Sequence, residues 1–496
     1  MILIKSINTS IIAGILICLF IFVKTSKSEP APVYYQEIDA RGNKIKRDAS
    51  INQVRDFTVV LSLDIKGLSG TTNSQFRALP LTPKTKKWRK IGKNAARNVA
   101  RKAIEEILAK NISKKKFSLK DTDVISIGEY YSFSGSFDND SLETIRNMKE
   151  VKYIQEVGQA FIDDDVIIKS DIVLNNYTAS PNTKILKTDS LNFKRQAIQT
   201  QYQRYAPWAL SRLSSSDLPD IIYPYGNGYA YPNEGEGVVV YIFDSGININ
   251  HQEFEGRAFY GPNLSINPKT GVPYEDDDDH YGHGTAVASS VGGKTFGVAK
   301  KSTLISYKIY SYGASLPATL IMNALDMVVD EIENSEDGRK ASIVNCSYVT
   351  TFDQAFNDAV VEFNKRGFIF TVSAGNQRND ACLRSPPSSP GAISVGGTDA
   401  SDNLSLTSNY GNCVQIFAPG TNVYSAGIDS SNSLVLSTGT SYSAPIVAGI
   451  CALILCDNPS LTPDQVLDKL VEYAVKDKIK LNVTSANVLA HVPRHF

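Results

Sequence analysis

From about residue 236 onward, continuous apolar runs of strand length alternate with longer stretches of helical spacing. Short runs that are apolar throughout predict strands buried on both faces, and apolar positions three or four residues apart predict helices. Strands joined by helical crossovers form a parallel sheet covered by helices, so the pattern predicts an α/β fold with three layers. The predicted strands are 237–244, 302–310, 341–348, 367–376 and 391–397, and the predicted helices are 318–334 and 353–367.

A different pattern occupies residues 53–165 and predicts a small α+β unit. Its expected elements are strands at 56–65, 129–137 and 151–157 and a short helix at 141–148. Between the first two strands lies the basic segment 84–116, which holds thirteen Lys or Arg residues but only two Glu. Its Ala-rich, Pro-free middle favours a helix that faces water, because charge runs are usually solvated. Binding to nucleic acid or to an acidic partner is the alternative for this segment.

The N-terminus has the pattern of a secretory signal peptide. Lys5 precedes an apolar run at 11–23, and small polar residues follow that run. The run is short for a membrane span, so we expect a membrane association only if the signal stays uncleaved. Residues 166–205 lack a sustained apolar period and are interpreted as a cleavable linker. The predicted domains are a signal peptide at 1–28, a segment at 29–195 with its folded core at about 53–165, and a main domain at 196–496.

Composition narrows the choice of partners and compartment. Lys plus Arg and Asp plus Glu both number 51, so the net charge indicates no nucleic-acid partner. The signal predicts entry into the secretory pathway and release from the cell, with a vacuole or the cell surface as alternative destinations. We expect a monomer.

Two polar residues end predicted strands, where ligand sites of parallel sheets lie. Asp244 ends the run 237–244, and a carboxylate at that place can hold an imidazole. Asn376 ends the run 367–376, and its side-chain amide can donate a hydrogen bond to a developing oxyanion. Taken singly, each is also an ordinary turn residue.

A histidine and a serine complete a possible catalytic set. His283 lies between Gly282 and Gly284, just before a predicted helix of small residues. Ser441 opens an apolar helix that carries Pro445 in its expected first turn, so backbone N–H groups and the helix dipole would favour an oxyanion there. A serine becomes a nucleophile only with a base and a group that orients that base. The chain order Asp, His, Ser matches the order known for subtilisin.

Longer stretches around these residues resemble the subtilisin-like serine proteases, most closely the proteinase K-like branch. The similar stretches include IFDSGININHQEFEGRA, GHGTAVASSVGGKTFGVAKK, SAGNQRNDACLRSPPSSPGAISVGGTD and STGTSYSAPIVAGICALIL, within about 200–475. The unit at 53–165 is more loosely similar to the family's propeptide inhibitor domain.

The resemblance implies a subtilisin-like fold and a secreted serine endopeptidase made as a zymogen. It implies that Ser441 attacks the peptide carbonyl, that His283 acts as base and then acid, and that Asp244 orients His283. Asn376 and the Ser441 backbone N–H would hold the oxyanion. The implied partners are polypeptide substrates and the chain's own propeptide, which would act as an intramolecular inhibitor.

The substrate groove departs from the family pattern. Ser347, Tyr348 and Val349 stand in SYVT where the family has Ser-Leu-Gly-Gly, so these residues are the expected substrate-binding segment and Val349 is expected to narrow the specificity pocket. This departure leaves an alternative, namely a catalytically impaired binding protein with the same fold.

The resemblance also implies a disulfide between Cys382 and Cys413, with the other three cysteines of the main domain as buried thiols. No cofactor is expected to be required. A calcium site of the family uses an Asp at the position of Gln415, so calcium binding there is doubtful, because a hard cation favours carboxylates. The acidic run 275–279 is another possible calcium site, although we expect it to be a solvated loop.

Overall fold

The computed structural model describes most of the chain from residue 200 onward and parts of the region before it. The described residues are 31–34, 55–62, 101–102, 104–105, 124–161, 166–170, 200–218, 226, 228–267, 272, 274–310, 316–494 and 496. The expected signal peptide, and most of the basic segment and of the linker, lie outside these residues.

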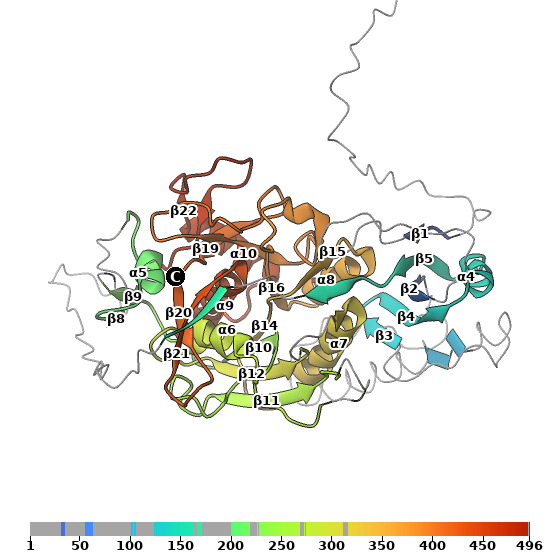
Figure 1. Ribbon diagram of the computed structural model, residues 1–496, viewed down its shortest axis with the longest axis horizontal. Helices are drawn as coiled ribbons and strands as arrows, with labels where there is room; N and C mark the ends of the chain where they lie inside the picture. The colour runs from blue at the N-terminus through green and yellow to red at the C-terminus, as the bar shows by residue number, and fades with distance from the viewer. Residues whose placement is uncertain are drawn as a thin grey trace, which may run out of the picture.

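A nine-stranded sheet forms the centre of the main domain (Figure 1). Its neighbouring strands are parallel, except that the last pair, β22 and β23, is antiparallel. The fold class predicted from the sequence, a mainly parallel sheet within an α/β fold, is therefore confirmed. In spatial order the strands are β11 (Ala258–Asn263), β12 (Thr303–Lys308), β10 (Val238–Asp244), β14 (Ala341–Cys346), β16 (Ile369–Ser373), β18 (Ile393–Thr398), β19 (Ile416–Pro419), β23 (Val488–Leu489) and β22 (Val475–Lys476).

Alternation along β10 shows how the sheet builds two cores. Val238, Val240 and Ile242 pack with residues of helices α6 and α9, whereas the residues between them pack with helices α7 and α8 on the other face. The sheet is thus the middle of three layers, as expected. These helices are α6 (His283–Gly292), α9 (Thr440–Asp457), α7 (Ala318–Asn334) and α8 (Gln354–Lys365), and α10 (Pro463–Tyr473) packs on α9.

Helix α9 is long and apolar enough to cross a membrane by length and composition alone. However, 94% of its 18 residues are buried inside the protein. It is therefore a core helix, and its apolar surface is explained by packing against the sheet and α6.

The N-terminal part of the chain forms a separate five-stranded sheet that helix α4 (Asn139–Arg146) covers. The side chain of Ile104, from the basic segment, is buried in the same core, and Arg101 pairs with Glu105 one helical turn away at 3.1 Å. The described part of the basic segment thus has an apolar contact besides its charged face. In spatial order the strands are β1 (Val33–Tyr34), β5 (Val151–Glu156), β2 (Arg55–Leu61), β4 (Tyr130–Phe137) and β3 (Val124–Ile127).

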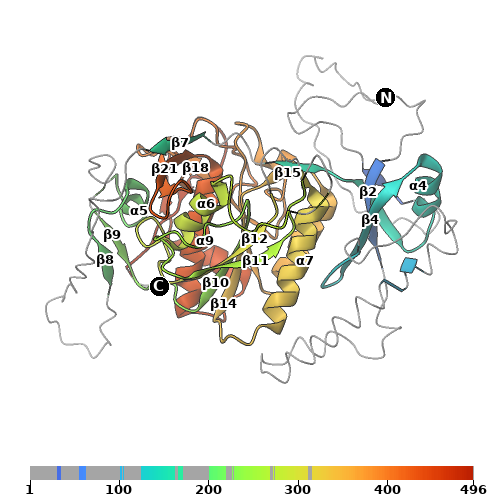
Figure 2. The same cartoon turned by 60° about the horizontal axis from the view of Figure 1, so that its bottom comes forward.

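This N-terminal unit packs against helices α7 and α8 of the main domain. Figure 1 shows both helices beside it, and Figure 2 shows it on the side of α7. Val60 and Ile127 are buried in the same core cluster as these two helices. At the rim, Tyr153 donates its hydroxyl to the Asp358 carboxylate at 2.7 Å. The contact between the two units is therefore an apolar cluster to which both contribute buried side chains.

Two short strands extend from the N-terminal unit across the main domain. Strand β6 (Gln159–Phe161) is inserted between β13 (Leu316–Pro317) and β15 (Val349–Thr351), and it is antiparallel to both. Strand β7 (Val166–Ser170) adds to β21 (Leu434–Thr438). The start of the expected linker is therefore a paired strand. The remaining strands are β17 (Arg384–Ser385), β20 (Val423–Ala426), β8 (Gln201–Gln203) and β9 (Tyr229–Tyr231), and the short helices are α5 (Trp208–Leu213) and η3 (Ala381–Leu383).

Candidate active site

The carboxyl end of the central strand β10 meets the first turn of helix α6. Asp244 is the last residue of β10 and His283 is the first residue of α6. The Asp244 Oδ1 and His283 Nδ1 atoms are 2.7 Å apart, and both side chains have no exposed surface. Gly284 permits this approach, because a Cβ atom there would come within 2.1 Å of the Gly246 carbonyl oxygen.

The environment of Asp244 balances burial against hydrogen bonding. The Ser245 backbone N–H donates to Asp244 Oδ1 at 2.7 Å. Burial raises the pKa of the Asp244 carboxyl, and the adjacent His283 and the Ser245 N–H partly offset that increase. The imidazole is thus held by a carboxylate that lies away from water.

A second buried carboxylate, that of Asp279, connects the loop after β10 to the start of α6. Its Oδ1 accepts from Ser245 Oγ and from the Gly282 N–H, both at 2.8 Å. Its Oδ2 accepts from Thr285 N at 2.9 Å and Thr285 Oγ1 at 2.7 Å, and the Gly284 N–H donates to Ser245 Oγ at 3.0 Å. Asp279 therefore fixes the two segments that carry Asp244 and His283.

The burial of Asp279 corrects part of the sequence interpretation. The run 275–279 was expected to be a solvated loop, and its other members are exposed or half-buried, but Asp279 is 4% exposed. Charge alone could not identify it. Its position four residues before His283 was the only available signal.

Ser441 lies at the start of helix α9, and Asn376 lies beside it. The helix begins at Thr440, so Ser441 is its second residue and Pro445 lies in the second turn rather than the first. Asn376 Oδ1 accepts hydrogen bonds from Thr440 N and Thr440 Oγ1, both at 2.9 Å. Because these bonds fix the oxygen end of the amide, the Asn376 Nδ2 group is the end that can serve as an oriented donor.

The substrate-binding segment expected from the sequence adjoins Ser441. Ser347 donates its hydroxyl to the Ser441 carbonyl oxygen at 3.1 Å. Tyr348 has no exposed surface and packs in the core near Tyr310, with ring centroids 5.9 Å apart, so its side chain belongs to the core. Val349 is 2% exposed and begins β15, opposite Phe161 of β6.

The structure thus brings four separated segments to one edge of the sheet. Helices α6 and α9 pack together, and the rings of His283 and Tyr442 lie 5.6 Å apart. Asp244, Asn376 and the Ser347 segment follow neighbouring parallel strands, whose carboxyl ends share that edge. The Tyr348 side chain belongs instead to the core cluster that contains α7 and α8.

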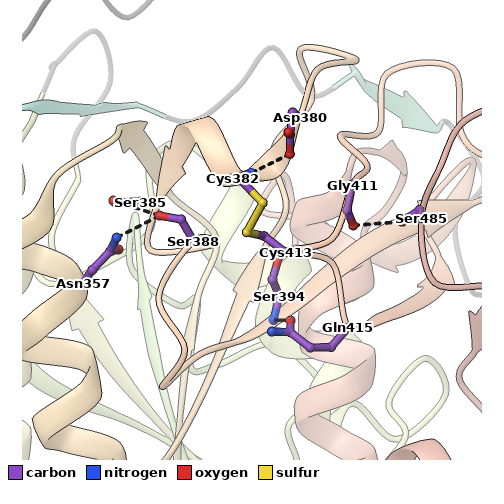
Figure 3. The surroundings of a disulfide bond; sticks show 10 residues. All are labelled: Asn357, Asp380, Cys382, Ser385, Ser388, Ser394, Gly411, Cys413, Gln415 and Ser485. Atoms are coloured by element: carbon purple, nitrogen blue, oxygen red, sulfur yellow. Dashed lines mark hydrogen bonds between the residues drawn. A yellow bond between two sulfur atoms is a disulfide. The ribbon is translucent and has the colours of Figure 1, made fainter. Parts of the chain in front are cut away.

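The disulfide implied by the resemblance is present beyond Asn376. Cys382 and Cys413 are joined, with their Cα atoms 5.2 Å apart, and Asp380 accepts from the Cys382 N–H at 2.9 Å (Figure 3). The three remaining cysteines of the main domain are buried thiols: Cys346, Cys451 and Cys456.

The two possible calcium positions do not fit that cation. Gln415 Oε1 already accepts from the Ser394 N–H at 2.7 Å, and it carries no charge (Figure 3). In the acidic run, the Lys308 ammonium donates to the carbonyl oxygens of Asp276 and Asp278 at 2.6 Å each, so a cation already lies there. Within the part of the chain that the structure describes, no cluster of three or more His, Cys, Asp or Glu side chains could hold a metal ion.

Comparison with known proteins places this geometry in a family. The model of the subtilase family matches residues 235–491, just over half of the chain. The chain belongs to the subtilase family. This subtilase is therefore a serine endopeptidase, and the resemblance and the activity class predicted from the sequence are confirmed.

Individual relatives agree with the assignment of this subtilase. It is 31% identical to alkaline protease 1 of Aspergillus flavus over 391 residues, which are 78% of this chain and 85% of the relative. It is 36% identical to subtilisin-like protease 2 of Trichophyton verrucosum over 294 residues, 59% of this chain and 68% of the relative. The crystal structure of a cold-adapted subtilisin-like serine proteinase aligns with a TM-score of 0.52 at 32% identity, and the match covers 58% of this chain and 98% of that one.

Proposed function

We propose that the subtilase cleaves peptide bonds through a triad of Asp244, His283 and Ser441. The buried 2.7 Å contact between Asp244 Oδ1 and His283 Nδ1 carries this proposal. A carboxylate that accepts from Nδ1–H selects the tautomer in which Nε2 is unprotonated. Nε2 is then the base that can take the proton from the Ser441 hydroxyl.

The proposed reaction has two halves that pass through an acyl-enzyme. Ser441 Oγ attacks the carbonyl carbon while its proton moves to His283 Nε2. The resulting oxyanion receives hydrogen bonds from the Asn376 Nδ2 group and the Ser441 N–H, at the positive end of helix α9. His283 then gives its proton to the leaving amine, and a water molecule activated by the same imidazole hydrolyses the ester.

We further propose that the enzyme is made as a secreted zymogen whose residues 29–195 inhibit it. Two features support this: β6 is inserted between β13 and β15, and β7 pairs with β21 just before Ser441. A segment bound as an added strand at β15 and at β21 excludes other polypeptides from the same edges. Removal of the N-terminal unit would then release the site.

Fluorophosphonate labelling of the processed protein tests the catalytic assignment. We expect mass spectrometry to find the label on Ser441, and we expect His283→Ala to abolish labelling while the protein stays folded. A correctly processed, folded protein that is not labelled would contradict the triad and favour a binding protein without catalytic activity.

A further inference from the structure

Strand β17 places a buried arginine beside the substrate segment. Arg384 is 3% exposed and lies opposite Thr351 in the antiparallel pair of β17 and β15. Residues opposite each other in such a pair have their side chains on the same face of the sheet, and so do alternate residues along one strand. Arg384, Thr351 and Val349 therefore share one face.

The other face of this small sheet is directed to helix α8. Ser385 Oγ accepts from the Asp353 N–H at 2.8 Å, next to the start of α8, and Ala160 is buried in the core cluster that contains α7 and α8. Ser385 of β17 and Ala160 of β6 both pair with Thr350 of β15, which lies between them. Their side chains therefore share the face of Thr350, which is not the face of Arg384. The guanidinium of Arg384 is consequently on the face turned away from α8.

The strand register connects this face with the reacting carbonyl. A chain bound like β6 has one residue opposite Thr350 and the next opposite Val349, so two positions further along it lies opposite Ser347. The Ser347 hydroxyl donates to the Ser441 carbonyl oxygen at 3.1 Å. The residue of the bound chain that lies opposite Ser347 is therefore the P1 residue, whose carbonyl carbon Ser441 attacks. The P1 residue is two positions after the residue of the bound chain that lies opposite Val349. Its side chain is therefore on the same face as those of Val349 and Arg384.

Charge then indicates which side chain this site accepts. A guanidinium presents a planar pair of N–H donors and a positive charge, and the two oxygens of a carboxylate match both. The chain's own sequence has the matching chemistry: Asp163 is two positions after Phe161, and two more aspartates follow it.

We propose that Arg384 makes this subtilase selective for an acidic side chain, Asp or Glu, at P1. The inference rests on the proposed function, since it assigns a specificity residue to the same site. Val349 shapes the pocket on the same face, and the Arg384 guanidinium is the group with which a P1 carboxylate pairs.

The test uses processed enzyme that has been titrated at its active site with fluorophosphonate. Fluorogenic peptides that differ only at P1, with Asp, Glu, Asn, Gln, Phe or Lys, are compared by kcat/KM. We expect Glu or Asp to exceed its amide counterpart at least tenfold. Arg384→Gln should lower kcat/KM for the acidic peptides on the order of a hundredfold and leave the Gln peptide nearly unchanged.

Two further variants separate selectivity from a structural role. Arg384→Glu should move the preference toward the Lys peptide, and loss of packing alone cannot have that effect. Lys469→Gln, on the exposed side of α10, is the control for loss of a distant charge. Enzyme that labels at Ser441 but prefers Phe to both acids, or an Arg384→Gln enzyme that loses activity on all peptides alike, would overturn the inference alone. Absence of Ser441 labelling would overturn the proposed function and this inference with it.

Discussion

The Asp279 carboxylate accepts a hydrogen bond from Ser245 Oγ at 2.8 Å, and this bond joins the end of β10 to the start of α6. Asp244 precedes Ser245, and His283 is four residues after Asp279. The short distance between Asp244 and His283 thus depends on a carboxylate that is hydrogen-bonded to their chain neighbours, Ser245 and Gly282. We expect Asp279 to be a positioning residue for the triad.

Asp279→Ala should leave several buried donors without their acceptor. We expect a destabilisation of about 2–5 kcal/mol and, in the protein that remains folded, a loss of at least tenfold in kcat/KM. Urea denaturation and kinetics on titrated enzyme measure the two effects, with Glu275→Ala on the exposed part of the run as the control. Unchanged kinetics in folded Asp279→Ala would show that the carboxylate is not needed to position the triad.

Asn376→Ala removes the proposed side-chain donor to the oxyanion. We expect kcat to fall by about 10²–10³ with little change in KM, because the donor acts mainly in the transition state. That range is the established effect for subtilisin, a member of the same family, so its magnitude is taken over from there. Asn379→Ala, three residues along the same loop, is the control. An equal loss in both variants would indicate a disturbed loop rather than a lost donor.

Ala160→Pro tests the strand-addition account of inhibition. Ala160 is the middle residue of β6 and pairs with both β13 and β15, and a proline there removes a backbone donor from the added strand. We expect the variant N-terminal segment, supplied in trans to processed enzyme, to inhibit at least tenfold more weakly than the natural sequence. Circular dichroism checks that its own sheet still forms. Equal inhibition constants would argue against β6 as an inhibitory contact.

Asp353 gives a prediction for the pH dependence of stability. It caps helix α8 by accepting from the Phe356 N–H at 3.0 Å, and burial raises its pKa from 3.8 to about 6. The folded state therefore binds the Asp353 proton more tightly than the unfolded state does. The contribution of this proton to the free energy of unfolding is complete below about pH 4 and is lost as the pH rises through 6. An asparagine keeps the cap but cannot ionise.

In an uncleaved Ser441→Ala background, Asp353→Asn should therefore be more stable than its parent at pH 8, by on the order of 2–3 kcal/mol. At pH 4.5 the advantage should shrink to under about 1 kcal/mol. Urea denaturation at the two pH values measures this difference. The same advantage at both would mean that ionisation of Asp353 is not its cause.

Replacing both Cys382 and Cys413 by serine should destabilise the main domain without abolishing labelling of Ser441. The bridge closes a loop of 31 residues, for which a loss of about 2–4 kcal/mol is expected. Urea denaturation of the Ser441→Ala protein, with the Cys451→Ser variant as a control for a buried thiol outside the bridge, provides the measurement. No difference in midpoint between parent and double variant would contradict a stabilising role.

The elements that bury two faces were the most accessible to prediction from the sequence. The helix 318–334 has the bounds of α7, and the strand 237–244 differs from β10 by one residue, because strong apolar periodicity survives in any tertiary context. Asp244 could be placed because it ends such a strand, and Asn376 because it follows one, three residues after the end of β16. These positions follow from local pattern and from the topology of parallel sheets.

Other features depend on contacts between distant segments. Val166–Ser170 carries no pattern of its own that separates it from a linker, and it becomes a strand only because β21 offers an edge. Asp279 was one charge among five, and Arg384 lies in a two-residue strand, too short for any periodicity. Their roles arise from burial and register, which the local sequence does not express.

Strands β6 and β7 have a consequence for which proteins this subtilase can cut. Strand β6 pairs with β15, which follows the Ser347 segment, and β7 pairs with β21, which ends just before Ser441. A target that fills the same edges must present extended, unpaired backbone, and a folded domain can do so only by local opening. The rate of cleavage of a compact protein should then follow the free energy of opening that segment, so that loops and termini are cut first and stable domains persist.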